Sequence, residues 1–162
     1  MYDGAVSFYH RKVQLHKYLG DLPDLTIVSL DEGGQVDTIE FNKITKSYSV
    51  EEKEEYEFLL SEISLAIQMS DLKKIGEVST RSAILNQKLW RKRYLTDVLD
   101  ICKQTDGLGI VVAHSGTCIG ILFSPSLPSY HSNIYHAYHL LREINDNIEI
   151  FFANNNRTSA FL

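Results

Sequence analysis

The sequence predicts an α+β fold in which an antiparallel sheet carries helices on one face, close to the ferredoxin-like arrangement. Three observations lead to this prediction: the order of the expected elements, two apolar strands too close together for a helical crossover, and amphipathic helices of ordinary length. The chain has 162 residues, enough to bury one core, and shows no internal repeat or clear linker. We therefore expect residues 1–162 to form a single domain.

The first predicted strand runs from Leu25 to Leu30, an apolar and β-branched stretch bounded by Pro23 and by a turn at Gly33 and Gly34. Residues 36–41 alternate apolar and polar side chains. They indicate either a continuation of the first strand beyond the glycines or a short edge strand.

Three helices are expected next. Ser49 and Glu52 have capping-box spacing ahead of apolar residues that recur at helical intervals. Asp71 can cap a second helix that runs to about Leu89, and Tyr94–Lys103 has the apolar periodicity of a third.

The C-terminal third predicts a hairpin, a helix and a final strand. The hairpin joins the apolar segments 109–113 and 118–123, with the polar His-Ser-Gly-Thr insert as its turn. A helix over His131–Ile144 and a strand over Ile148–Ala153 follow. This order of elements is that of the split βαβ fold.

The composition limits the classes of molecule that this protein is expected to bind. A formal net charge of −5 argues against general binding to nucleic acid or to an anionic membrane surface, because both need excess Lys and Arg. The sequence has no signal peptide or membrane-spanning run, and its two cysteines form no CxxC pair. We therefore expect a cytoplasmic protein that binds small molecules or proteins, with no nucleic-acid or membrane partner.

The His-Ser-Gly-Thr insert is the most distinctive polar segment. Gly116 permits close approach of the backbone, and the hydroxyls of Ser115 and Thr117 can bind a phosphate or carboxylate. A hairpin turn built from turn-favouring residues explains the same composition. Residue types alone leave both interpretations open.

A resemblance to a known family bears on this choice. The segment around the insert, GLGIVVAHSGTCIGILF, resembles the third conserved motif of the GHMP kinases, which include galactokinase, homoserine kinase, mevalonate kinase and phosphomevalonate kinase. It departs from the usual Gly-rich form, and AHSGT closely resembles the L-threonine kinases of cobalamin synthesis and propanediol utilisation. Three further segments resemble that branch in the same order: MYDGAVSFYHR from Met1, LDEGGQVDT from Leu30 and STRSAILNQ from Ser79.

The resemblance implies the C-terminal half of a two-domain kinase that transfers the γ-phosphoryl group of ATP to the hydroxyl of L-threonine. The family's phosphate loop does not occur in this sequence, so we expect the N-terminal ATP-binding domain to be absent. ATP and Mg²⁺ are then cofactors of the complete enzyme, and the missing domain is a partner needed for activity. The family's catalytic Asp precedes the stretch that Met1 and Tyr2 match, so no catalytic residue is assigned to this chain.

An amino-acid acceptor carries a carboxylate, which a guanidinium can grip in bidentate fashion. Within the STRSAILNQ segment Arg81 is the candidate for this role; the alternative is a solvated arginine on a helix surface. Polar residues at helical spacings around it form the rest of the predicted substrate site: Ser79, Ser82 and Asn86.

Two other groups complete the predicted site. Asp37 and Thr38 follow the glycine turn and can bond the amino and carboxylate groups of the acceptor, although local backbone bonding explains them equally well. The hairpin tip is expected to contact the transferred phosphate or the threonine side chain, through His114, Ser115, Gly116 and Thr117.

Two further patterns have simpler explanations. His136 and His139 have a spacing that suits a shared metal, but no matching ligands are evident, so no metal site is predicted. The run WRKRY, residues 90–94, mixes basic and aromatic side chains as RNA-binding surfaces do. The acidic net charge favours a solvated helix junction instead.

The leading hypothesis is therefore a threonine-kinase domain, and the alternative is a stand-alone amino-acid-binding or regulatory module without catalysis. The sequence does not distinguish threonine from serine or homoserine, because one methyl group changes binding by only about 1–3 kcal/mol. We expect a homodimer if the chain exposes an apolar patch.

Overall fold

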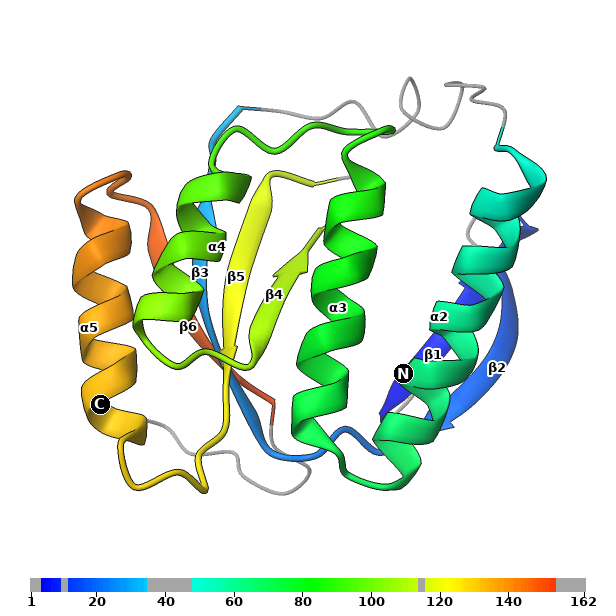
Figure 1. The fold of residues 1–162 in the computed structure, drawn as a ribbon, viewed down its shortest axis with the longest axis horizontal. Helices are drawn as coiled ribbons and strands as arrows, with labels where there is room; N and C mark the ends of the chain where they lie inside the picture. The colour runs from blue at the N-terminus through cyan, green and yellow to red at the C-terminus, as the bar shows by residue number, and fades with distance from the viewer. Residues whose placement is uncertain (1–3, 10–11, 35–47, 114–115, 154–162) are drawn as a thin grey trace.

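The structure, a computed structural model, describes residues 4–9, 12–34, 48–113 and 116–153. Its elements follow in this order: β1 (Ala5–Tyr9), β2 (Gln14–Gly20), β3 (Leu25–Asp31), α2 (Val50–Gln68), α3 (Leu72–Asn86), α4 (Leu95–Gln104), β4 (Gly109–Val112), β5 (Cys118–Phe123), α5 (Tyr130–Arg142) and β6 (Ile148–Ala153). Strands β3 to β6 form an antiparallel sheet in the order β4-β5-β3-β6, and β1 and β2 form a separate hairpin (Figure 1). This strand order, with its helical connections, is the split βαβ arrangement, so the predicted fold class is confirmed.

The main core lies between the four-stranded sheet and the helices α4 and α5. Alternate strand residues point to it, as the two-residue period of a strand requires, and Val28, Ile110 and Ile121 are all fully buried there. Cys102 of α4 belongs to the same core, where burial raises the pKa of its thiol to about 11. It therefore packs as a small hydrophobic residue, as buried free cysteine usually does.

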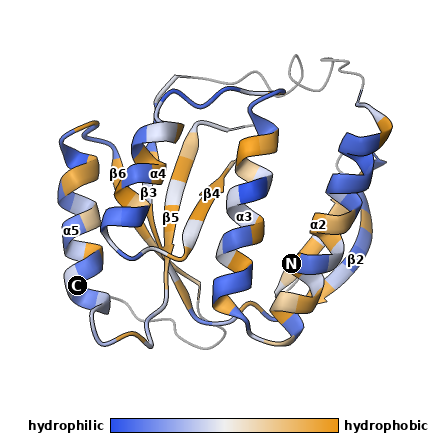
Figure 2. Cartoon of the chain, viewed as in Figure 1, coloured by the Kyte–Doolittle hydropathy of each residue, from blue (hydrophilic) through white to orange (hydrophobic). Residues whose placement is uncertain are grey.

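Hydropathy follows this layering. Figure 2 shows mainly hydrophobic residues along β4 and β5, whereas the helices carry both hydrophobic and hydrophilic residues. Within the described residues, no helix is both long enough and apolar enough to cross a membrane.

Both predicted helix caps are present. The side chain of Ser49 accepts the backbone N–H of Glu52 at 3.2 Å, and the Glu52 carboxylate accepts the N–H of Ser49 at 2.8 Å. At the start of α3, the carboxylate of Asp71 accepts the N–H of Lys74 at 3.0 Å. Helix α3 ends at Asn86, before the predicted end, and a turn follows it.

Helix α3 runs unusually close to the edge strand β4. A Cβ atom at Gly76 would lie only 2.1 Å from the carbonyl oxygen of Leu108, so the contact requires glycine. One turn later, Thr80 Oγ1 accepts the backbone N–H of Ile110 at 2.9 Å. Helix α2 packs in turn against α3 (Figure 1).

The hairpin of β1 and β2 was missed by the sequence prediction. Most of its side chains are exposed or half-buried, and Leu19 is its buried hydrophobic residue, so the sequence lacks a strong two-residue alternation. Leu19 packs in a second cluster with Ile67 of α2 and Leu122 of β5. The strand predicted over residues 36–41 lies outside the described residues.

Candidate functional site

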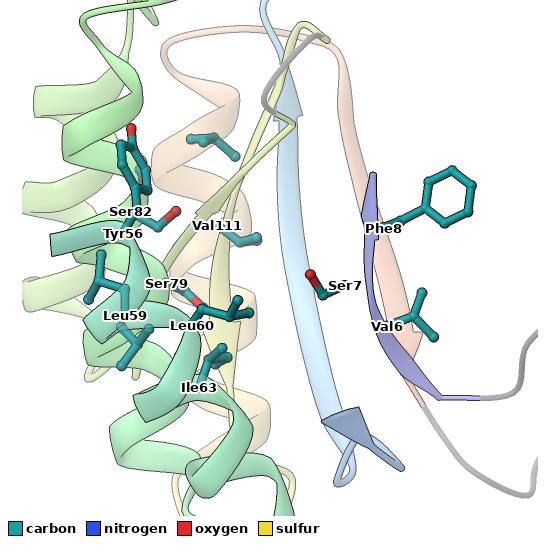
Figure 3. Close-up of a pocket in the computed structure, with 13 residues that line it drawn as sticks. Val6, Ser7, Phe8, Tyr56, Leu59, Leu60, Ile63, Ser79, Ser82 and Val111 are labelled. Carbon is teal, nitrogen blue, oxygen red and sulfur yellow. The ribbon is translucent and has the colours of Figure 1, made fainter. Parts of the chain in front are cut away.

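Two hollows are relevant to the predicted site. The larger, which we call the helix cleft, has a volume of about 710 Å³ and lies between β1, α2, α3 and β4 (Figure 3). The smaller, which we call the sheet-end pocket, has a volume of about 470 Å³ and lies where β3 ends and β5 begins. The sheet-end pocket is lined by Glu32, Gly33, Gly34, Trp90, Arg91, Arg93 and Thr117.

The helix cleft contains two of the predicted substrate residues. Ser79 and Ser82 line it from α3, and Ser7 points toward the helices from β1 (Figure 3). Most of the other lining residues are apolar, and none of the described lining residues carries a charge. The cleft can therefore bury an apolar group and hydrogen-bond to a polar group attached to it, but its described residues offer no group that neutralises a carboxylate.

Arg81 lies outside both hollows. Its Nε donates to the Glu55 carboxylate of α2 at 2.6 Å, and this hydrogen bond raises the pKa of Arg81 above its ordinary value. The structure therefore places Arg81 in an exposed ion pair between α2 and α3, away from Ser79 and Ser82.

Asn86, the last residue of α3, is fully buried. Neither its side-chain oxygen nor its side-chain nitrogen finds a hydrogen-bond partner among the described residues. It lines neither hollow, and its predicted contact with substrate stays a prediction. Four other predicted site residues lie outside the described ranges: Asp37, Thr38, His114 and Ser115.

The sheet-end pocket joins two segments that the sequence singled out separately. The N–H of Glu32 donates to the carbonyl oxygen of Thr117 at 3.1 Å, which ties the glycine turn to the hairpin tip. The Thr117 hydroxyl donates to the Asp31 carboxylate, and the N–H of Gly33 donates to it at 2.9 Å. These two hydrogen bonds hold the pKa of Asp31 below its ordinary value.

A buried lysine connects the same pocket to the segment before α4. Lys92 is 2% exposed, and its Nζ donates to the carbonyl oxygen of Gly116. Its backbone N–H donates to Gln87 Oε1 at 2.8 Å, and the N–H of Tyr94 donates to Glu32 Oε1 at 2.9 Å. Burial lowers the pKa of Lys92, and the nearby Glu32 carboxylate opposes that shift.

Arg91 and Arg93 flank this lysine in sequence, and both line the sheet-end pocket. Both are exposed, and neither forms an ion pair with any residue in the described ranges. The Arg93 guanidinium lies 5.7 Å from the centre of the Tyr94 ring. A pocket lined by two arginines and one glutamate can offer charged hydrogen-bond donors to a carboxylate or phosphate.

The sequence prediction missed these arginines. The signal was present in the WRKRY run, but it was interpreted as a solvated helix junction. Nothing in the run itself indicates that it folds against the hairpin tip.

The described residues give less support to a metal site than to an anion site. They contain no group of three or more His, Cys, Asp and Glu side chains placed to hold a metal ion. The sheet-end pocket is lined by two arginines and one glutamate, which suits an anionic group.

Three solved structures that resemble this fold are kinases of small molecules. Mevalonate kinase from L. major, in complex with R-mevalonate, matches with a TM-score of 0.67 and 17% identity over 85% of this chain and 44% of the kinase. Homoserine kinase from Cytophaga hutchinsonii matches with a TM-score of 0.62 and 14% identity over 94% of this chain and 49% of that one. A further mevalonate kinase has a TM-score of 0.54 and 20% identity over 80% and 39%.

This chain therefore spans less than half the length of the kinases it matches. No protein-family model matches the sequence, and no curated protein matches it significantly. The structural neighbours are GHMP-family kinases, and the chain has the fold of their C-terminal domain.

Proposed function

We propose that this chain is the acceptor-binding part of a GHMP-type kinase that phosphorylates the hydroxyl group of a small amino acid, L-threonine in the first instance. The observation that carries the proposal is a pair of arginines in the sheet-end pocket, Arg91 and Arg93, that form no ion pair with any residue the structure describes. The fold shared with mevalonate and homoserine kinases supports the reaction class. Threonine rests on the resemblance of the AHSGT segment to the L-threonine kinases.

The carboxylate of the acceptor binds to Arg91 and Arg93 in this proposal, in place of Arg81. A carboxylate at Arg81 would have to share the guanidinium with Glu55, which already accepts a hydrogen bond from Nε at 2.6 Å. In the sheet-end pocket it meets two guanidinium groups and a single Glu32 carboxylate, one oxygen of which accepts the Tyr94 N–H. The sheet-end pocket therefore binds an anion at a lower cost in existing interactions.

The chain contributes binding and orientation to phosphoryl transfer. Gly116 accepts a hydrogen bond from Lys92 and Thr117 donates one to Asp31, so these two residues form a fixed wall beside the arginines. A fixed wall matters because a positioned nucleophile replaces a bimolecular encounter with a nearly unimolecular step. ATP with Mg²⁺ supplies the phosphoryl group when it is bound in the complete enzyme.

The first test is amino-acid binding by this chain, measured by isothermal titration calorimetry at constant ionic strength with L-threonine, L-serine and L-homoserine. We expect Arg91→Gln and Arg93→Gln each to weaken binding by about tenfold or more, since a charge-assisted hydrogen bond contributes about 1.5–3 kcal/mol. Arg81→Gln is the matched control and should leave the affinity unchanged. Absence of binding to all three amino acids, or a loss confined to Arg81→Gln, would contradict the proposed site.

Catalysis needs a separate measurement. The chain is combined with the ATP-binding half of a GHMP kinase, and formation of O-phosphothreonine from ATP is followed by mass spectrometry. Product formation that falls in the Arg91 variant supports the kinase. Threonine binding without product in any combination would favour the regulatory module instead.

A further inference from the structure

Strand β6 ends the four-stranded sheet and exposes three adjacent apolar side chains. Ile150 is 37% exposed, Phe151 is 48% exposed and Phe152 is 56% exposed. Within the described residues, β6 pairs only with β3, so the backbone groups of its other edge have no strand partner. An open edge of this kind is a template for pairing with another strand.

Strand β6 lacks most of the usual protections of an edge strand, as far as the described part of the chain shows. Its six residues, IEIFFA, include one charged side chain, Glu149, and no proline or lysine. Its register with β3 runs from Ile148 to Ala153 without a bulge. Natural proteins normally block such an edge by charge, proline, a bulge or a covering element.

We propose that β6 pairs antiparallel with β6 of a second copy of this chain, about a two-fold axis that passes through Phe151. The two four-stranded sheets then form one continuous sheet. Residues opposite each other in an antiparallel pair lie on the same face, so the axis must pass through a residue and not between two. This proposal does not depend on the proposed kinase function.

The sequence of β6 favours Phe151 as the centre. In that register Phe151 faces its own copy, Ile150 faces Phe152 of the second chain, and Glu149 faces Ala153. Centring on Ile150 would place the Glu149 carboxylate opposite Phe151, and centring on Glu149 would oppose two like charges, which destabilises a cross-strand pair. Centring on Phe152 would pair only three of the six residues.

The two faces of the sheet suit this register. Phe151 lies opposite Ile27 in the β3 register, on the face away from α4 and α5, beside an apolar hollow of about 280 Å³ that Val111 and Gly120 also line. Phe152 lies opposite Thr26, whose hydroxyl bonds Tyr130 of α5, so it belongs to the other face. Pairing therefore covers apolar side chains on both faces.

The expected dimer is weak. The three side chains expose on the order of 300 Å² in each copy, given that a buried aromatic residue covers about 150–250 Å². A standard interface buries roughly 800 Å² on each partner. We therefore expect association in the micromolar range, driven by these side chains and by the strand hydrogen bonds.

Cysteine cross-linking tests the register directly. Opposed Cα atoms in an antiparallel pair are about 4.5–5.5 Å apart, within the range of a disulfide. We expect Phe151→Cys to form a covalent dimer under mild oxidation, above the background that the wild-type Cys102 and Cys118 set. Glu149→Cys alone should stay at that background, and the double variant with Ala153→Cys should cross-link again. Cross-linking by Glu149→Cys alone and not by Phe151→Cys would overturn the register.

Sedimentation velocity over a range of concentrations tests the association itself. The wild-type chain should self-associate, and Phe151→Lys should remain monomeric with an unchanged circular dichroism spectrum. Phe58→Lys is the matched control, because Phe58 is 59% exposed on α2, and it should associate like wild type. A wild-type chain that stays monomeric at millimolar concentration, or a dimer that persists in Phe151→Lys, would overturn the proposal.

Discussion

The two edge strands of the four-stranded sheet, β4 and β6, differ in whether another described element covers their outer edge. At β4, helix α3 covers the edge, Gly76 allows the close approach, and Thr80 supplies an acceptor for the strand N–H of Ile110. At β6, no described element pairs with the outer edge, and apolar side chains face solvent. Both strands are apolar in sequence, so the difference comes from residues on a helix that is remote in the chain.

The largest expected effect is at the glycine of the covered edge. Gly76→Val would place side-chain atoms against the carbonyl group of Leu108, and backbone atoms cannot move aside as a flexible side chain can. We expect a loss of at least about 3 kcal/mol in the free energy of unfolding, measured by urea denaturation. Glu77→Val, at the next and exposed position of the same helix, is the control and should change it little. Equal losses for both variants would mean that helix propensity, and not the close contact, is responsible.

The second effect concerns the strand N–H at the same edge. Thr80→Val keeps the side-chain shape but removes the acceptor of the Ile110 N–H, at a cost of about 1–3 kcal/mol for an unpaired buried group. Hydrogen exchange of the Ile110 amide should accelerate in this variant. Thr96→Val, on the exposed side of α4, should change neither quantity. An unchanged exchange rate at Ile110 would mean that another group protects this edge.

Most of the sheet could be predicted from the sequence, because strands such as Leu25–Asp31 are continuous apolar runs bounded by turn residues. The helix caps were also predictable, since Ser49 and Asp71 act on residues close in sequence. The hairpin of β1 and β2 was not predictable, because a mostly exposed strand leaves little periodic signal. The covering of the β4 edge by α3 was not predictable either, because it depends on which helix lies beside the strand.

The candidate site also has residues whose grouping the sequence could predict and residues whose grouping it could not. Ser79 and Ser82 are three residues apart and share a helix face, whereas Arg81 is two residues from one and one from the other. Neighbours at those spacings point in different directions, so Arg81 could not have joined the two serines. Arg91 and Arg93 were visible as a basic run, but only the fold brings them to the hairpin tip.

A third prediction concerns the end of the covering helix. Asn86 buries an amide whose atoms have no partner among the described residues, which is a cost that the rest of α3 does not carry. Asn86→Leu keeps the branched shape and should raise the free energy of unfolding by about 1 kcal/mol. Gln87→Leu is the contrasting control and should lower it, because Gln87 bonds both the Ala83 carbonyl and the Lys92 N–H. Destabilisation by Asn86→Leu would mean that the amide has a partner in solution.

The smallest effect is expected at the open edge. Phe152→Thr keeps a residue that favours strands and removes an exposed ring, so the dilute chain should keep its stability to within about 0.5 kcal/mol. The same variant should weaken self-association, because Phe152 faces Ile150 of the second copy in the proposed pair. Thermal unfolding at low concentration and sedimentation at high concentration separate the two effects. A clear loss of stability in the dilute chain would mean that Phe152 packs within its own chain, and β6 would then not be an open edge. If stability holds and association weakens, the apolar composition of β6 serves contacts between chains, whereas that of β4 serves the core.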